Sequence, residues 1–200
     1  DTGAGFYEGS TDITRTYALG EIPDLMKEHF TLIVMCNLSL ASARFVKGCT
    51  GSNLDPFARK PLWDRGLDFN HGTGHGVGYL LNIHEGPENI GWRSRGNNIV
   101  ELEEGMIFTD EPGIYIEGSH GVRLENELLV REGEKNAYGQ FMYLEPITYV
   151  PFDLNALKVE MLSEEYKKLL NDYHKTVYEK VSPYLNEEEK EWLKTYTRTI

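Results

Sequence analysis

Four carboxylates and one imidazole stand in short stretches of unusual composition and could bind metal ions. They are Asp1, Asp12, His75, Glu111 and Glu125, in the stretches DTGAGFYEGSTDITRT, HGTGHGVG, DEPGIY and VRLENE. An apolar core does not accommodate so many charges, because a buried charge must be paired or must coordinate a metal. Four oxygen donors with one nitrogen donor suit two divalent cations that share bridging carboxylates and hold a water between them.

The octet HGTGHGVG is the strongest local signal. His71 and His75 are four residues apart, a spacing that pairs zinc ligands on a helix, but glycine occupies every second position from 72 to 78. Glycine in a helix interior costs about 1 kcal/mol relative to alanine. The octet is therefore predicted to be extended or looped and to approach another group closely. A glycine-rich surface loop with incidental histidines is the alternative.

Several other catalytic motifs are excluded by their spacing. The stretch HEGPE that begins at His84 lacks the second histidine of a zinc-protease HExxH helix, and Pro87 is incompatible with a helix interior. The chain contains no GxGxxG dinucleotide fingerprint with a following helix and no GxSxG nucleophile elbow. Cys36 lies on an apolar helix face and is predicted to pack in the core.

Two acidic stretches near the predicted strands offer further ligands. Asp110 and Glu111 end an apolar strand immediately before a turn, which places a carboxylate at a strand end; a solvated turn is the alternative. Strand alternation puts Arg123, Glu125 and Glu127 on one face. Arg123 could then orient a metal-binding Glu125, or the three charges could form a solvent-exposed face.

The first of the elements that must position these residues is a hairpin. Residues 1–17 are predicted to form two short strands with a turn between Gly5 and Gly9. Such a hairpin would bring Asp1 and Asp12 to roughly opposite positions on one face.

Two helices are expected after the hairpin. The first opens at Pro23, keeps helical spacing of apolar residues as far as Phe45 and ends at Gly48. The second runs over residues 55–64, with Asp55 as its N-cap followed by a proline.

The rest of the chain changes from strands to helices, which predicts an α+β fold. The C-terminal helix should begin with a capping box formed by Asn186 and Glu189. Strand-rich pieces are expected at 106–110, 114–117, 122–131 and 141–150, and helices at 163–181 and 187–197.

Composition restricts the partners of this 200-residue chain. A formal net charge of −12 argues against nucleic acid or an anionic membrane surface as a partner. The longest apolar run, Phe30 to Cys36, is too short to span a bilayer. Two cysteines fit a reducing, cytoplasmic location. Because the chain starts inside a motif, its natural N-terminus is expected to lie further upstream.

In order and spacing, the motifs resemble those of the aminopeptidase P branch of the pita-bread metallopeptidases, the superfamily of methionine aminopeptidase, prolidase and creatinase. The first motif is similar to the family's DSGAxYxxGTTDxTRT, although Gly5 stands where glutamine is common. HGTGHGVG, NIHEGP, DEPGIY and GVRLEN follow in the family's order. The resemblance implies a pita-bread (creatinase/aminopeptidase) fold truncated at its N-terminal side. A partial catalytic domain would occupy residues 1–150 and a C-terminal helical extension residues 151–200.

The resemblance also implies a role for each residue of the site. His71 and His84 would handle the substrate and stabilise the tetrahedral intermediate, and Tyr115 and Arg123 would shape the site. Glu111 would also pass a proton to the leaving nitrogen. The ligands of two divalent metal ions would be Asp1, Asp12, His75, Glu111 and Glu125.

The activity that the resemblance implies is hydrolysis of an N-terminal Xaa-Pro peptide bond by a hydroxide that bridges two divalent metals. The oxygen-rich donor set favours Mn²⁺, with Zn²⁺, Co²⁺ or Fe²⁺ as alternatives. The expected partners are peptides with proline at the second position and a second copy of the chain in a homodimer. Two other functions stay open: a prolidase that cleaves Xaa-Pro dipeptides, and a pita-bread module that binds peptides without catalysis.

Overall fold

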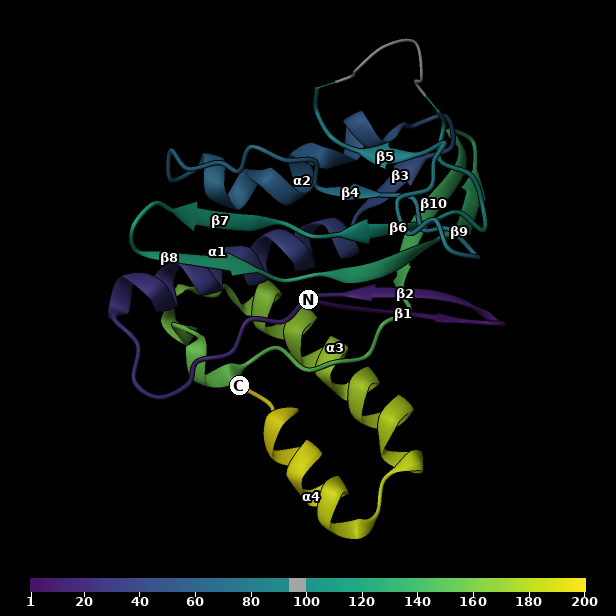
Figure 1. Ribbon diagram of the computed structural model, residues 1–200. Coiled ribbons are helices and arrows are strands. Elements are labelled where there is room, and N and C mark those ends of the chain that lie inside the picture. The colour runs from purple at the N-terminus through teal and green to yellow at the C-terminus, as the bar shows by residue number, and fades with distance from the viewer. Residues whose placement is uncertain (94–99) are drawn as a thin grey trace.

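The computed structural model describes residues 1–93 and 100–200 and mixes helices and sheets, as expected for an α+β chain (Figure 1). The helices are α1 (Asp24–Ala41), α2 (Gly51–Trp63), α3 (Glu164–Val181) and α4 (Glu187–Tyr196). The strands are β1 (Thr2–Phe6), β2 (Gly9–Ile13), β3 (Arg44–Val46), β4 (Gly74–His75), β5 (Asn89–Ile90), β6 (Ile107–Asp110), β7 (Gly113–Ile116), β8 (His120–Arg123), β9 (Asn126–Asn136) and β10 (Gly139–Pro146). Among the described residues, no helix is both long and apolar enough to cross a membrane.

One sheet has the strand order β3-β10-β9-β6, with antiparallel neighbours throughout. Three two-stranded ladders accompany it, β1 with β2, β4 with β5 and β7 with β8. In Figure 1, α1 runs behind the strands, and the α3–α4 hairpin extends away from them. The expected hairpin near the N-terminus is confirmed, with Phe6 opposite Gly9 at its turn.

Helix α1 is shorter than the sequence predicts. It ends at Ala41 instead of Gly48, and Phe45 lies in β3, opposite Met142 of β10. The prediction was wrong because Phe45 falls on the apolar spacing of the helix, whereas its burial comes from the sheet. A three-residue strand carries no periodicity of its own.

Helix α2 begins earlier than predicted, at Gly51 instead of Asp55. The Asn53 side chain accepts a hydrogen bond from the Thr50 N–H at 2.8 Å, in a capping box. The expected N-cap, Asp55, is fully buried and accepts hydrogen bonds from Arg59 Nε at 2.6 Å and Thr73 Oγ1 at 2.5 Å. An aspartate before a proline resembles an N-cap in sequence, but here Arg59 of the same helix and Thr73 of the octet bind its carboxylate inside the helix.

The strand expected over residues 122–131 is interrupted. Strand β8 ends at Arg123 and β9 begins at Asn126. The Glu125 N–H bonds to the carbonyl of Thr14 at 3.0 Å instead of joining a ladder with β6 or β7. The interruption brings Glu125 to the segment that follows β2.

The C-terminal helices agree with the prediction. Ser163 caps α3 by accepting a hydrogen bond from the Tyr166 N–H, and Asn186 and Glu189 form the expected capping box of α4. Cys36 is buried in the core, also as predicted.

The buried apolar residues form two clusters. The first joins α1, β7, β8 and α3 and includes Ile114 and Leu124. The second joins α2 to the four-stranded sheet and includes Phe108 and Leu128. The chain therefore passes from one cluster to the other between Phe108 and Ile114, and back again between Leu124 and Leu128.

Candidate metal centre

The β1–β2 hairpin positions two of the predicted ligands. Its register sets Asp12 opposite Gly3. Because side chains alternate along a strand, Asp1 lies on the same face as Gly3 and is a diagonal neighbour of Asp12. The two carboxylates thus share a face, as the sequence suggested.

The glycine-rich octet is extended, and its glycines allow close backbone approach. Gly74 and His75 form β4, which pairs with β5. A Cβ at Gly74 would lie 1.6 Å from the Thr109 carbonyl oxygen, and one at Gly76 would lie 2.1 Å from the Glu85 carbonyl oxygen. No side chain fits at these positions, so glycine lets His75 lie directly against β6.

Glu111 and Glu125 are oriented by two threonines that the sequence analysis did not select. Thr109 Oγ1 donates to Glu111 Oε1 at 3.3 Å, and Thr14 Oγ1 donates to Glu125 Oε2 at 2.6 Å. Each threonine lies two residues from a predicted ligand, Thr109 before Glu111 and Thr14 after Asp12. That proximity was the only signal in the sequence that could have found them.

The structure brings all five predicted ligands together. His75 Nε2 lies 3.5 Å from Asp12 Oδ2 and 3.5 Å from Glu111 Oε1. Ligand atoms lie within 4.8 Å of one another in three overlapping groups: Asp12, His75 and His84; His75, Glu111 and Glu125; and Asp1, Asp12 and Glu125. Since Asp12, His75 and Glu125 each belong to two groups, the arrangement suits neighbouring cations that share ligands.

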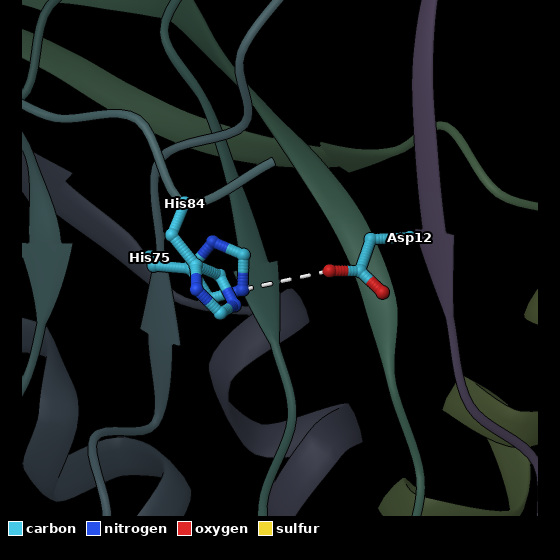
Figure 2. A group of neighbouring side chains, drawn as sticks. All are labelled: Asp12, His75 and His84. Carbon is cyan, nitrogen blue, oxygen red and sulfur yellow. Dashed lines mark ion pairs between the residues drawn. The ribbon is translucent and has the colours of Figure 1, made fainter. Parts of the chain in front are cut away.

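His84 lies closer to the ligands than its expected role in substrate handling requires. Its ring packs edge-on against that of His75, with centroids 4.2 Å apart. Figure 2 shows both imidazoles facing the Asp12 carboxylate, with the ion pair from His75 to Asp12 dashed. His84 is therefore a further donor that could reach a cation.

Burial makes the acidic groups of the centre difficult to ionise. Burial, and to a lesser extent the nearby Asp12 carboxylate, raises the pKa of Glu111 and of Glu125 to about 7. Burial also raises the pKa of Glu127, which accepts a hydrogen bond from the Asp12 N–H at 2.9 Å, to about 7. Cations would relieve this repulsion, so the donor set fits divalent metal ions.

Asp110 is an unexpected member of this acidic region. It is fully buried, and neither carboxyl oxygen has a hydrogen-bond partner among the residues that the structure describes. Burial raises its pKa well above the usual value, and Glu125 and Glu111 raise it further. The sequence placed Asp110 beside the ligand at the strand end, whereas its side chain lies in the interior.

Arg123 contributes a positively charged side chain to this predominantly acidic site. Its Nη2 donates to Asp1 Oδ2, and its Nε donates to Thr14 Oγ1 at 3.3 Å. Arg123, Tyr115 and His71 line the same cavity of about 550 Å³ beside the acids. Arg123 and Tyr115 therefore lie beside the predicted ligands, and their role in shaping the site stays a prediction.

His71 lies against Tyr115, with ring centroids 5.5 Å apart. Its Nδ1 donates to the Gly72 carbonyl at 2.7 Å, and burial lowers its pKa, which favours the neutral ring. Nε2 is buried and has no hydrogen-bond partner in residues 1–93 and 100–200. His71 can therefore offer an acceptor to a group that reaches it.

A cavity of about 1100 Å³ opens beside the ligands. Acidic side chains line it, together with the apolar side chains of Phe6, Leu80 and Leu81. The Tyr79 hydroxyl donates to the Tyr7 carbonyl at 2.6 Å, which ties the loop after β4 to the hairpin turn. A cleft lined by both charged and apolar side chains suits a short peptide.

Comparison with known families gives two adjoining matches. Residues 1–132 match metallopeptidase family M24, and residues 140–200 match the C-terminal region of peptidase_M24. The "Probable Xaa-Pro aminopeptidase P" of Pyrenophora teres f. teres is 44% identical over 98% of this chain and 31% of its own length. "Aminopeptidase P1" of Arabidopsis thaliana is 42% identical over 100% of this chain and 31% of its own length.

Solved structures show the same relationship. The X-prolyl aminopeptidase of Caenorhabditis elegans, described as a cytosolic enzyme with a di-nuclear active site, aligns with a TM-score of 0.91 at 37% identity, over 99% of this chain and 32% of that chain. The prolidase of Pyrococcus furiosus aligns with a TM-score of 0.61 at 32% identity, over 74% of this chain and 40% of that chain. This chain thus spans about a third of the length of the curated relatives it matches.

Proposed function

The chain belongs to metallopeptidase family M24 and has its pita-bread fold, and from that premise we propose that the natural protein containing it is an Xaa-Pro aminopeptidase. It would use two divalent cations to remove the residue that precedes a proline at position two of a peptide. The observation that carries the proposal is the convergence of Asp1, Asp12, His75, Glu111 and Glu125 in overlapping groups of ligand atoms within 4.8 Å.

These five residues would hold the cations. When bound, two divalent cations lower the pKa of a water and polarise a peptide carbonyl. The threonines fix the carboxylates in advance, because Thr14 and Thr109 each donate to one oxygen of a ligand. Such prior orientation lowers the cost of ordering the site when it is loaded.

The remaining polar residues would act on the peptide. Glu111 lines the cavity and would accept a proton from the attacking water and pass it to the leaving nitrogen of proline. His84 lies at the exposed side of His75 and would donate to the developing oxyanion. His71 would accept a hydrogen bond from the substrate through Nε2, and Arg123 would hold Asp1 in place.

A prolidase is the second candidate, and solved prolidases do align with this chain. The match of residues 140–200 to the family's C-terminal region, and the near-complete alignment with the C. elegans enzyme, favour the aminopeptidase. Turnover of an Xaa-Pro-Xaa tripeptide and of the corresponding Xaa-Pro dipeptide by the natural protein separates the two. Cleavage of the dipeptide alone would identify a prolidase.

The decisive experiment measures metal content and tripeptide cleavage in the natural protein. Wild type should retain two divalent ions per chain, and Asp12→Ala or His75→Ala should lower activity by more than about 100-fold, since even residues that only orient ligands cost 10–100-fold. Asp64→Ala, in an exposed ion pair with Lys60, is the matched control and should behave as wild type.

Failure of wild type to retain metal or to cleave peptides would instead favour a non-catalytic binding module. The same metal analysis tests the preference for Mn²⁺ over Zn²⁺, Co²⁺ and Fe²⁺. The cytosolic location described for the C. elegans relative supports the same location for this protein. The homodimer stays a prediction.

A further inference from the structure

Arg15, the residue after Thr14, connects the metal centre to the C-terminal segment, residues 151–200. Arg15 follows the β2 strand that contains Asp12. Its Nη1 donates to the main-chain carbonyls of Thr14 at 2.9 Å and Glu125 at 2.5 Å. Both flanks of the Glu125 peptide are thereby held, because its N–H also bonds to the Thr14 carbonyl at 3.0 Å.

The opposite edge of the guanidinium faces α3 and the segment that leads to it. Nη2 donates to Asn126 Oδ1 at 2.7 Å, to the Val150 carbonyl at 2.7 Å and to the Tyr173 hydroxyl at 2.8 Å. The guanidinium carbon lies 4.4 Å from the ring centroid of Phe152. A rigid planar fork can satisfy so many acceptors at once, whereas a lysine cannot.

Tyr173 completes this network from α3. The side chain is buried, and burial raises the pKa of its hydroxyl, which therefore keeps its proton. Its hydroxyl lies 3.1 Å from Asn126 Oδ1 and 2.9 Å from the Val150 carbonyl. Asn126 is the neighbour of Glu125 and also accepts from Thr148 Oγ1 at 3.0 Å.

We propose that Arg15 and Tyr173 are positioning residues for Glu125, so that the C-terminal segment forms part of the scaffold of the metal centre. The inference rests on the proposed function, because it requires that Glu125 binds a cation. Thr14 orients the carboxylate of Glu125, and Arg15 with Tyr173 fixes the peptide from which that side chain extends. Loss of the network would let the peptide rotate and would displace the carboxylate from the other ligands.

The test compares two tyrosines on the same helix in the natural protein. Tyr173→Phe removes one hydroxyl from the network and keeps the ring against Phe152, whose centroid is 5.1 Å away. Tyr166→Phe removes the bond between the Tyr166 hydroxyl and Ser39 Oγ at 2.7 Å, which joins α3 to α1 away from the ligands. Mn²⁺ is titrated into each metal-free protein by calorimetry, and thermal unfolding is measured beside it.

Tyr173→Phe should weaken Mn²⁺ binding by about 10-fold, the lower end of the effect of residues that orient metal ligands. Tyr166→Phe should lower the unfolding temperature without changing Mn²⁺ affinity. Arg15→Lys, which keeps the charge but not the fork, should weaken binding at least as much as Tyr173→Phe and provides a second variant should Tyr173→Phe fail to fold.

Two results would overturn the inference while leaving the proposed function intact. One is wild-type Mn²⁺ affinity in both Tyr173→Phe and Arg15→Lys. The other is an equal loss of Mn²⁺ affinity in Tyr166→Phe, which would show that the loss in Tyr173→Phe reflects a general loss of stability. Absence of Mn²⁺ binding by wild type would instead overturn the proposed function, and this inference with it.

Discussion

Glu111 and Glu125 are proposed metal ligands whose carboxyl groups can also bind protons, so their protonation state affects metal binding. Burial raises the pKa of each carboxyl to about 7 when no cation is bound. Below that pH the metal-free site holds protons on the atoms that a cation needs. Protons and cations therefore compete for the same oxygens.

This competition predicts that metal affinity rises with pH up to about 7 and then levels off. Below pH 7, affinity should fall about tenfold per pH unit for each proton displaced. Titration of Mn²⁺ into metal-free protein between pH 5.5 and 8, in buffers of different ionisation enthalpy, measures both the affinity and the number of protons released.

Glu127 supplies the control for this prediction. Its pKa is also about 7, but it lies outside the groups of ligand atoms. Glu127→Gln should keep the pH dependence, and Glu125→Gln should reduce it. A Mn²⁺ affinity independent of pH between 5.5 and 7 would contradict the assignment of the two glutamates.

The sequence identifies the charged residues of the centre better than the residues that hold them. The five proposed ligands stand out because carboxylate and imidazole are typical metal ligands and lie here in short stretches of unusual composition. Thr14, Thr109 and the buried side chain of Asp110 do not stand out, because their roles depend on how separate strands approach one another. A threonine hydroxyl also bonds too commonly to its own backbone for its type alone to indicate a ligand contact.

Among the elements, β4 shows most directly why its sequence is rich in glycine. The strand lies so close to β6 that a Cβ at Gly74 would overlap the Thr109 carbonyl. Two residues earlier, a Cβ at Gly72 would be 3.4 Å from the nearest atom, the Ile90 carbonyl oxygen. The octet thus contains three glycines that packing requires, at positions 74, 76 and 78, and one that it does not, at position 72.

Gly74→Ala should therefore destabilise the protein by about 3 kcal/mol, the upper end of the range for overpacking, and abolish Mn²⁺ binding by displacing His75. Gly72→Ala should be close to wild type in both measurements. Chemical denaturation and calorimetric titration of the two variants test this pair. Wild-type stability in Gly74→Ala would show that β4 and β6 can move apart.

Helices and strands were predictable from the sequence where the local pattern and the tertiary contacts favour the same structure. The extended octet, the first hairpin and the caps of α3 and α4 followed from glycine spacing and capping residues. The end of α1 and the start of α2 did not. Phe45 has the spacing of a helix but pairs in a sheet, and Asp55 precedes a proline but accepts a hydrogen bond from the distant Thr73.

On the scale of the whole molecule, the acidic centre is a source of instability when it holds no cation. Glu125 has a folded pKa of about 7 against an ordinary value of 4.5. The folded state therefore binds the proton more tightly than the unfolded state does. The free energy of unfolding must fall as the pH rises from 4.5 to 7, and it stays reduced above pH 7.

Replacing this ligand should consequently stabilise the metal-free protein at pH 8. Glu125→Gln removes the charge and keeps an oxygen for Thr14, so it should raise the free energy of unfolding by about 1–3 kcal/mol. The gain should vanish near pH 5 and reverse when Mn²⁺ is added, because the variant binds the ion poorly. Denaturation of wild type and variant at pH 5 and pH 8, with a chelator and with Mn²⁺, measures the difference in the free energy of unfolding. A metal-free variant that is less stable than wild type at pH 8 would contradict the prediction.

The overall fold was recognisable from its motifs, but the arrangement of its sheet was not. Strand order β3-β10-β9-β6 joins residues near position 45 to residues near position 142. Alternation of residue types assigns strands and faces, and it contains no information about which distant strand becomes a neighbour.

The two apolar clusters have a consequence for how the protein unfolds. Glu111 lies where the chain leaves the cluster of Phe108 for that of Ile114, and Glu125 lies where it returns from Leu124 to Leu128. Cations held by both glutamates would act as a cross-link at the two crossings. Loading the centre would therefore strengthen the coupling between the two cores, which α1 already joins through Leu38 and Leu40.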